Sequence, residues 1–359
     1  MKLSVFSAKA YDRHHLDRAA QAQAQPRPRP RPSSPVPIDI TYHDFPLSPE
    51  TTALAAGADA VCVFVNDTVS AAVVDALADL GVGAVLLRCA GFNNVDLAAA
   101  RRRRLVVANV PAYAPDAVAE FAVALIQTLN RRTHRAYNRV REGNFSLDGL
   151  LGHTLRGKTV GIVGTGRIGL ATAALLAAFG CRVLAHDPVP RPDALARVGG
   201  TYVSLDDLLP ACDILSLHCP LTDATRHLID DAALARVKPG LMLVNTSRGG
   251  LVDTHAVIRA LKTNRLGALA LDVYEAEGAL FYDDHSADII QDDVLMRLMT
   301  FPNVLVCGHQ AFFTVEALTE IAESTMRNLQ EFAASGSCQN SLTKDPAPQG
   351  REPLPVRNV

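Results

Sequence analysis

The sequence predicts an α/β protein of two domains, each built on a parallel β-sheet. Its 359 residues exceed what one compact core usually holds. Short apolar strands alternate with helical segments along most of the chain, which is the pattern of parallel sheets with helical crossovers. A glycine-rich turn at residues 164–169 separates one such strand from its helix, and it predicts that the second sheet is doubly wound around a nucleotide.

The first domain is expected to span residues 1–112. Its strands are predicted at residues 3–7, 38–42, 60–65, 84–88 and 105–108, and helices at 49–56 and 70–80. The proline- and arginine-rich stretch 25–37 can form neither a helix nor a central strand, so it predicts a surface insertion, with a ligand for a proline-recognising domain as the alternative. The basic run 101–104 fits a solvated helix C-terminus better than a nucleic-acid patch.

The second domain is expected to span residues 113–310. A long amphipathic helix over 115–141, acidic at its start and basic at its end, opens it. Strands are predicted at 159–164, 182–187, 213–218, 241–246, 268–273 and 304–307, enough for a complete doubly wound sheet. A last helix over 314–334 returns to the first domain, so residues 311–334 complete that domain, and the polar tail 335–359 is expected to be poorly ordered.

The glycine-rich turn predicts a dinucleotide cofactor. Gly164, Gly166 and Gly169 have G-x-G-x-x-G spacing, which permits a tight turn, close approach of a pyrophosphate and close packing of helix on strand. The helix N-terminus then presents free N–H groups to the phosphates. Asp187, at the end of the next strand, would hold the ribose hydroxyls and repel a 2′-phosphate, which favours NAD over NADP. A glycine turn without a ligand, and an aspartate that only forms a turn before Pro188, are the alternatives.

Three later strands end in residues suited to acid–base chemistry on an anionic substrate. Arg248 follows one strand, and its planar guanidinium fits a carboxylate held at two points, unless it forms a salt bridge within the protein. The next strand leads to three carboxylates, the last of them Glu277, and the final strand leads to His309. A histidine supported by a carboxylate is a common proton donor to a carbonyl, although a single histidine is more often structural.

The composition limits the kinds of partner and the cellular compartment that are expected for the chain. The net charge of −2 and pI near 6.6 favour neither nucleic acid nor a membrane. The seven cysteines form no C-x-x-C pair and no metal-like group with histidines, so no metal is expected and the thiols are expected to be reduced. With neither a signal peptide nor a long apolar run evident, the expected location is cytoplasmic.

From its first strand to about Arg327 the chain resembles the D-specific 2-hydroxyacid dehydrogenase family, and most of all its D-lactate dehydrogenase branch. The resemblance implies two Rossmann-like domains, a doubly wound NAD-binding domain and a smaller flavodoxin-like substrate domain. The stretches that carry it are AVCVFVND, LRCAGFNNVDL, NVPAYAPDAVAEFA, GIVGTGRIG, DILSLHCPLT, LVNTSRGGLVDT, LALDVYEAE and FPNVLVCGHQAFFT.

The resemblance also implies roles for single residues. Arg248 would bind the substrate carboxylate and 2-oxo group, and Glu277 would support His309 as the acid–base. The expected substrate-binding residues are Ala90 and Gly91, through backbone N–H groups, and Tyr113 and Phe312 along the pocket. The expected cofactor-binding residues are Gly164, Thr165, Gly166, Arg167, Ile168, Gly169, Asp187, His218, Pro220, Thr246 and Asp272, with a buried structural histidine as the alternative for His218.

The implied reaction is hydride transfer between NAD and a D-2-hydroxy acid, with pyruvate and D-lactate favoured. Phenylpyruvate, 2-oxoisocaproate and hydroxypyruvate remain open, because one methylene changes binding by only about 1–3 kcal/mol. The non-enzymatic alternative is an NAD-sensing corepressor or scaffold, for which only the 25–37 stretch and the tail could serve as regulatory segments. The resemblance also implies a homodimer, with the 115–141 helix as its interface.

Overall fold

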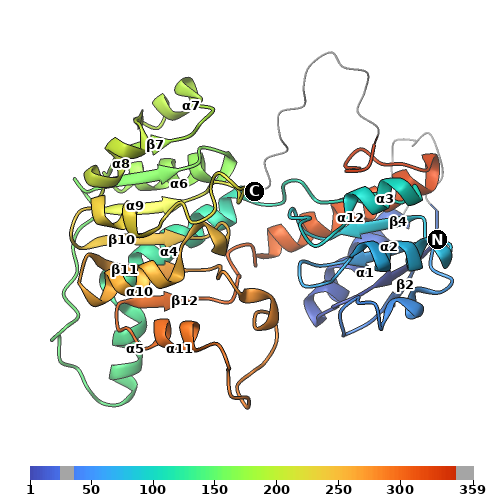
Figure 1. Ribbon diagram of the computed structural model, residues 1–359, viewed down its shortest axis with the longest axis horizontal. Helices are drawn as coiled ribbons and strands as arrows, with labels where there is room; N and C mark the ends of the chain where they lie inside the picture. The colour runs from blue at the N-terminus through green and yellow to red at the C-terminus, as the bar shows by residue number, and fades with distance from the viewer. Residues whose placement is uncertain (25–35, 345–359) are drawn as a thin grey trace. The chain divides into compact units, whose positions relative to one another are not determined.

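The computed structural model describes residues 1–24 and 36–344 and divides into two compact units (Figure 1). The first unit holds Met1–Ala114 and the chain from Phe313 onward, and the second unit holds Pro115–Phe312. Most of the predicted insertion at 25–37, and residues 345–359 of the predicted tail, lie outside the described residues.

The first unit contains a five-stranded parallel sheet in the order β2-β1-β3-β4-β5. This is the flavodoxin-like order, and it confirms the predicted fold class of this unit. The central strands read as unbroken apolar runs because both faces of a parallel sheet are covered. The strands are β1 (Lys2–Val5), β2 (Asp39–Tyr42), β3 (Ala60–Val63), β4 (Ala84–Leu87) and β5 (Val106–Ala108).

Helices cover this sheet and complete its core. The helices are α1 (Ala10–Ala24), α2 (Ala71–Asp79), α3 (Leu97–Arg103) and α12 (Val315–Ser335). The chain returns through α12, whose Met326 and Leu329 are buried with Leu3 and Leu16 in one core, and Figure 1 shows this red helix beside the blue strands. The helix predicted over 49–56 is only the 3-10 helix Thr52–Ala55, which ends at Ala56, where the backbone leaves the helical conformation with ψ 128°.

Part of the predicted tail is ordered along a sheet edge. Ser341 pairs antiparallel with Ala108, and Leu342 N donates to Val107 O at 2.7 Å. The hydroxyl of Thr343 accepts from Val107 N and donates to Leu105 O. The prediction of a poorly ordered tail from residue 335 is therefore wrong as far as residue 344, because this segment satisfies the open edge of β5.

The second unit contains a seven-stranded parallel sheet in the order β12-β11-β10-β9-β6-β7-β8. Counted from β6 the order is that of a doubly wound dinucleotide-binding sheet with one further strand, which confirms the predicted fold class. The prediction missed only β8, two residues long. The strands are β6 (Thr159–Val163), β7 (Arg182–His186), β8 (Thr201–Tyr202), β9 (Ile214–Leu217), β10 (Leu241–Asn245), β11 (Leu266–Leu271) and β12 (Val304–Val306).

The helix predicted over 115–141 is two helices, α4 (Pro115–Arg131) and α5 (Thr133–Arg141), broken at Arg132 with φ +50°. Buried residues of α4 pack in the core with α6, whereas no residue of α5 is buried. The other helices are α6 (Arg167–Ala178), α7 (Pro192–Ala196), α8 (Leu205–Ala211), α9 (Asp231–Arg236), α10 (Thr254–Lys262) and α11 (Asp293–Met299), with 3-10 turns at Gly249–Leu251 and Glu277–Ala279. Among the described helices, none has the length and apolar character needed to cross a bilayer.

Candidate active site

The glycine-rich turn between β6 and α6 has the geometry that a dinucleotide requires. Gly164 has φ +92°, and a Cβ there would lie 2.7 Å from the backbone of His218 and Cys219. A Cβ on Gly169 would lie 1.9 Å from Gly164 O, so only glycine lets α6 approach β6 this closely. Gly166 is the N-cap of α6, whose first turn begins with Arg167 and Ile168. No side chain caps this end of the helix, so its first N–H groups could bind the phosphates of a ligand.

Asp187 is tied to this turn. Its Oδ2 accepts from the backbone N and the hydroxyl of Thr165 at 2.7 and 3.0 Å, and its Oδ1 accepts from Val189 N at 2.8 Å. The side chain thus lies beside the turn, where the sequence predicts the ribose of the cofactor. Its contact with Thr165 was not predicted from the sequence.

Two buried polar atoms at the neighbouring strand ends are suited to hydrogen bonds with a dinucleotide. Within the described part of the chain, neither His218 Nδ1 nor Thr246 Oγ1 has a hydrogen-bond partner, although each residue is only 7% exposed. Burial lowers the pKa of His218 to about 4, so its ring is neutral, and Nε2 lies 2.9 Å from the Ser216 hydroxyl. Because unpaired buried polar atoms cost free energy, a ligand that pairs with them would bind favourably.

Arg248 lies on a turn that the end of β10 holds rigidly. The buried Asn245 side chain donates to Arg248 O at 2.9 Å and accepts from Ser247 N at 3.0 Å. Ser247 in turn donates to Cys219 O at 2.6 Å, which joins this turn to the segment after β9 that contains Pro220. Asn245 is a positioning residue that sequence reasoning missed, because an asparagine inside a predicted strand has no distinctive spacing.

The Arg248 guanidinium forms no ion pair with an acidic side chain of the residues that the structure describes. It is half-buried, and Nη1 donates to Ser247 O at 2.7 Å. The salt bridge considered as the alternative is therefore absent from the described chain. A half-buried guanidinium without a carboxylate partner is suited to an anionic ligand.

His309 and Glu277 are brought together as predicted. His309 Nδ1 lies 2.8 Å from Glu277 Oε1, and the two side chains are 19% and 24% exposed. The other carboxylate oxygen accepts from Tyr274 N at 2.8 Å, which fixes the carboxylate to its own loop. His309 has φ +54°, and its backbone N donates to Asp272 O. With Nδ1 held by the carboxylate, Nε2 is the atom left for proton transfer.

Asp272 organises the loop that leads to Phe312. Its buried carboxylate accepts from Gln310 N at 2.8 Å and Ala311 N at 3.0 Å. Burial raises the pKa of Asp272, while these two donors and the nearby His309 act in the opposite direction. Asp272 thus holds the backbone of His309 through its carbonyl oxygen and the backbone of the two following residues through its carboxylate.

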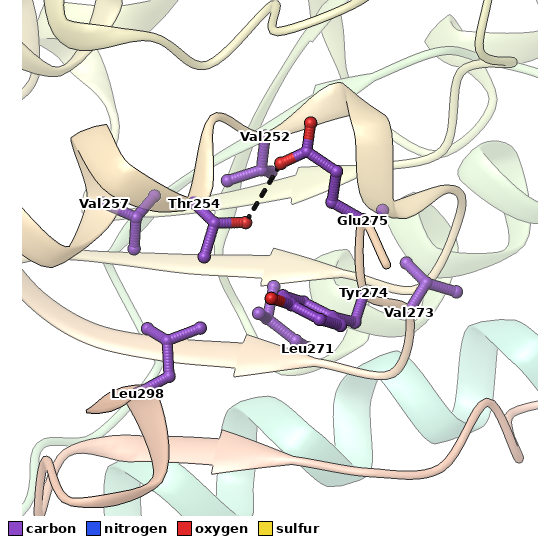
Figure 2. Close-up of a pocket in the computed structure, with 9 residues that line it drawn as sticks. Val252, Thr254, Val257, Leu271, Val273, Tyr274, Glu275 and Leu298 are labelled. Atoms are coloured by element: carbon purple, nitrogen blue, oxygen red, sulfur yellow. Dashed lines mark hydrogen bonds between the residues drawn. The ribbon is translucent and has the colours of Figure 1, made fainter. Parts of the chain in front are cut away.

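A second histidine–glutamate pair joins the segments around Arg248. His227 Nε2 lies 2.6 Å from Glu275 Oε1, and His227 N donates to Gly250 O at 2.8 Å. Figure 2 shows Glu275 bonded to Thr254, at 3.3 Å, beside a pocket with mostly apolar walls from Leu271, Val273 and other residues. This pocket has no room for a water-sized molecule, so it is packing space behind the strand ends and no ligand site.

The remaining predicted substrate residues belong to both units. In the first unit, Ala90 and Gly91 follow β4, and Ala90 O accepts from Asn109 Nδ2 at 2.7 Å. The preceding Arg88 is 2% exposed, pairs with Asp12 at 3.1 Å and donates to two backbone carbonyls, which anchors this loop. Tyr113 lies in the first unit, and the buried Phe312 in the second. In the described chain no group of three histidines, cysteines or carboxylates is placed to hold a metal ion.

Comparisons with known proteins agree with this geometry. A family model described as the NAD binding domain of D-isomer specific 2-hydroxyacid dehydrogenases matches residues 123–311. The chain is 60% identical to the D-lactate dehydrogenase kk1H of Curvularia clavata over 351 residues, 98% of each protein. It is similar to the apo-structure of D-lactate dehydrogenase from Escherichia coli, with a TM-score of 0.85, 46% identity, and coverage of 95% of this chain and 100% of that chain.

A third relative is the pyruvate reductase of Chlamydomonas reinhardtii, whose structure matches with a TM-score of 0.85 and 42% identity over 93% of this chain and 96% of that chain. The family model, the high identity and the near-complete coverage all lead to one assignment. The chain belongs to the D-isomer specific 2-hydroxyacid dehydrogenase family, in its D-lactate dehydrogenase branch, and is an NAD-dependent oxidoreductase that acts on CH–OH groups.

Proposed function

We propose that the chain reduces pyruvate to D-lactate, with Arg248, Glu277 and His309 as the catalytic residues. The observation that carries this proposal is the His309–Glu277 pair, 2.8 Å apart after neighbouring strands β12 and β11, with the Arg248 turn after the next strand, β10. In an open α/β sheet, ligands bind outside the carboxyl ends of the strands, so the three side chains share the edge at which the cofactor binds.

Each residue then has a distinct role. Arg248 binds the substrate carboxylate through its forked donors and orients the 2-oxo group. His309 delivers a proton from Nε2 to the carbonyl oxygen, and Glu277 orients the ring through its contact with Nδ1. Bound NADH supplies the hydride.

The cofactor is held by residues already placed around the glycine turn. Gly164, Thr165, Gly166 and the start of α6, at Arg167 to Gly169, receive the pyrophosphate. Asp187 accepts from the adenosine ribose hydroxyls. Pro220, His218, Thr246 and Asp272 lie on the segments that follow β9, β10 and β11, and they line the path toward the nicotinamide.

Ala90, Gly91, Tyr113 and Phe312 are the further substrate-binding residues in this proposal. Backbone N–H groups around Ala90 and Gly91 are assigned to the substrate carboxylate, and Tyr113 and Phe312 are each assigned to contacts with the substrate. The anchoring of this loop by Arg88 and Asn109 supports the role, because a binding site of backbone donors must be held rigid. The small substrate is supported by the relatives, which are named D-lactate dehydrogenase and pyruvate reductase.

The corepressor or scaffold alternative is not favoured, because these relatives are named as enzymes.

We also propose a homodimer. The second unit exposes large apolar side chains on the segment that follows α5, with Phe145 74%, Leu147 81% and Leu151 84% exposed. A second copy of the chain is a natural cover for such a patch. The seven free cysteines support a reducing compartment such as the cytoplasm.

The test is the loss of NADH absorbance with purified protein and a panel of 2-oxo acids. Pyruvate should be turned over with a higher kcat/KM than phenylpyruvate, 2-oxoisocaproate or hydroxypyruvate. Pyruvamide, which lacks the carboxylate that Arg248 binds, should be a poor substrate, and Arg248→Ala should raise the KM for pyruvate more than that for NADH. NADH binding without turnover of any acid would instead favour the sensing role.

A further inference from the structure

A hydrogen-bond chain runs from β8 to the predicted ribose-binding carboxylate. Arg191 N donates to the Tyr202 hydroxyl at 3.0 Å, Tyr202 donates to Thr165 Oγ1 at 2.7 Å, and Thr165 donates to Asp187 Oδ2 at 3.0 Å. The direction of every bond is fixed, because a backbone N–H can only donate and an ionised carboxylate can only accept. Tyr202 is therefore the donor that makes Thr165 turn its own proton toward Asp187.

This chain crosses three elements that a dinucleotide would contact or approach. Thr165 lies in the glycine-rich turn and is fully buried, Asp187 follows β7, and Tyr202 belongs to the short strand β8. Thr165 N and Val189 N also donate to the two carboxylate oxygens, so rotation of the Asp187 side chain is restricted from both sides. Hydrogen bonds between partly buried groups are stronger than in water, and a bond to a charged group contributes about 1.5–3 kcal/mol.

On the basis of the NAD site in the proposed function, we propose that Tyr202 is a positioning residue that sets the preference for NADH over NADPH. Through Thr165 it holds the Asp187 carboxylate beside the turn, where that carboxylate accepts from the ribose hydroxyls and repels a 2′-phosphate. Repulsion between like charges falls with distance, so an aspartate that can swing into solvent rejects the phosphate less well. The preference thus depends on how firmly Asp187 is held as well as on its presence.

The variant Tyr202→Phe tests this role with little disturbance of packing. The Tyr202 ring packs against the core that contains Val183 and Leu195, and phenylalanine keeps this contact while removing only the hydroxyl. The measurement is kcat/KM for NADH and for NADPH with saturating pyruvate. We expect the ratio of the two values to fall about tenfold, mainly through a higher KM for NADH, since about 1.4 kcal/mol corresponds to a factor of ten.

Thr165→Val, which removes the middle link, should lower the same ratio, and the double variant should lower it no further than Thr165→Val does, because both changes break one chain. Tyr137→Phe, at an exposed tyrosine of α5, is the matched control and should keep the wild-type ratio. Tyr202→Phe with a wild-type ratio, alongside an Asp187→Ala variant whose ratio falls, would overturn the inference and leave the proposed function intact.

A wild-type protein that turns over none of the acids would overturn the proposed function instead. The same variants would then be compared by fluorescence titration with NADH and NADPH. A lower ratio of the two affinities in Tyr202→Phe would support the inference, and an unchanged ratio would overturn it.

Discussion

His309 contacts Glu277 through its Nδ1 atom. A second histidine–glutamate pair, His227 with Glu275, lies in the same unit. If His309 is the proton donor, His309→Ala should lower kcat about 10²–10⁴-fold, which is the usual contribution of a general acid. NADH affinity, measured by fluorescence titration, should stay near the wild-type value. Glu277→Gln, which removes the carboxylate that contacts His309, should also lower kcat. Its matched control is Glu275→Gln, which should lower kcat far less. Near wild-type turnover in His309→Ala would exclude the assigned role.

His218 should make the stability of the apo protein depend on pH. Burial lowers its pKa to about 4, whereas an unfolded histidine titrates near 6.5. Between these values the unfolded chain binds a proton that the folded chain excludes, so the stabilising contribution is full above pH 6.5 and decreases as the pH falls toward 4. At pH 5 the loss is about 2 kcal/mol.

Urea unfolding at pH 7.5 and pH 5.0 measures this effect. The free energy of unfolding of the wild type should fall by about 2 kcal/mol more than that of His218→Gln, which carries no titrating ring. Equal falls in the two proteins would show that His218 is not buried in its neutral form.

At the scale of single residues, the sequence predicts site residues whose chemical type is unusual directly after an apolar strand. His309, Glu277 and Arg248 belong to that group, and the structure confirms the contact between His309 and Glu277. Asn245 was missed because an asparagine inside a predicted strand has no characteristic spacing. Tyr202 was missed because its partner Thr165 is distant in sequence. Such contacts depend on which strands become neighbours, and no local pattern specifies that.

The strand–turn–helix element β6–α6 depends on glycine at position 169. A Cβ there would lie 1.9 Å from Gly164 O, so Gly169→Ala must push α6 away from β6. We expect a loss of stability of about 1–3 kcal/mol and NADH affinity at least tenfold weaker, because the free N–H groups of α6 move from the phosphates. Thermal melting and NADH titration measure both effects.

Ala174→Ser, at an exposed position of α6, is the control and should change neither quantity appreciably. A Gly169→Ala variant that binds NADH with wild-type affinity would show that the close contact in this turn is not required.

Most elements could be predicted because their strands are short apolar runs between turn residues. The exceptions have identifiable reasons. Strand β8 has two residues, too few to show periodicity. The break at Arg132 is accompanied by contacts of its guanidinium with Gly149 O and Leu151 O, and a helical pattern does not contain them. The segment 341–343 has no strand signal of its own and is ordered by the edge of β5.

At the scale of the whole molecule, the proposed homodimer depends on the exposed apolar side chains beyond α4. Changing Phe145 and Leu147 together to aspartate should convert a dimer into a monomer, because two charges would have to be buried in the interface. Light scattering coupled to size-exclusion chromatography gives the mass directly. The matched control is a double change at Leu54 and Val189, exposed residues outside this patch, and it should remain dimeric.

A wild-type protein that elutes as a monomer at micromolar concentration would contradict the homodimer. A dimer that persists in the Phe145 and Leu147 variant would place the interface elsewhere on the chain.

The measurement that tests the central claim most directly is the chirality of the product. Purified protein is incubated with NADH and pyruvate, and the lactate formed is separated into its enantiomers by chiral chromatography. The account predicts D-lactate in an amount equal to the NADH consumed. L-lactate, or NADH consumption without lactate, would contradict it.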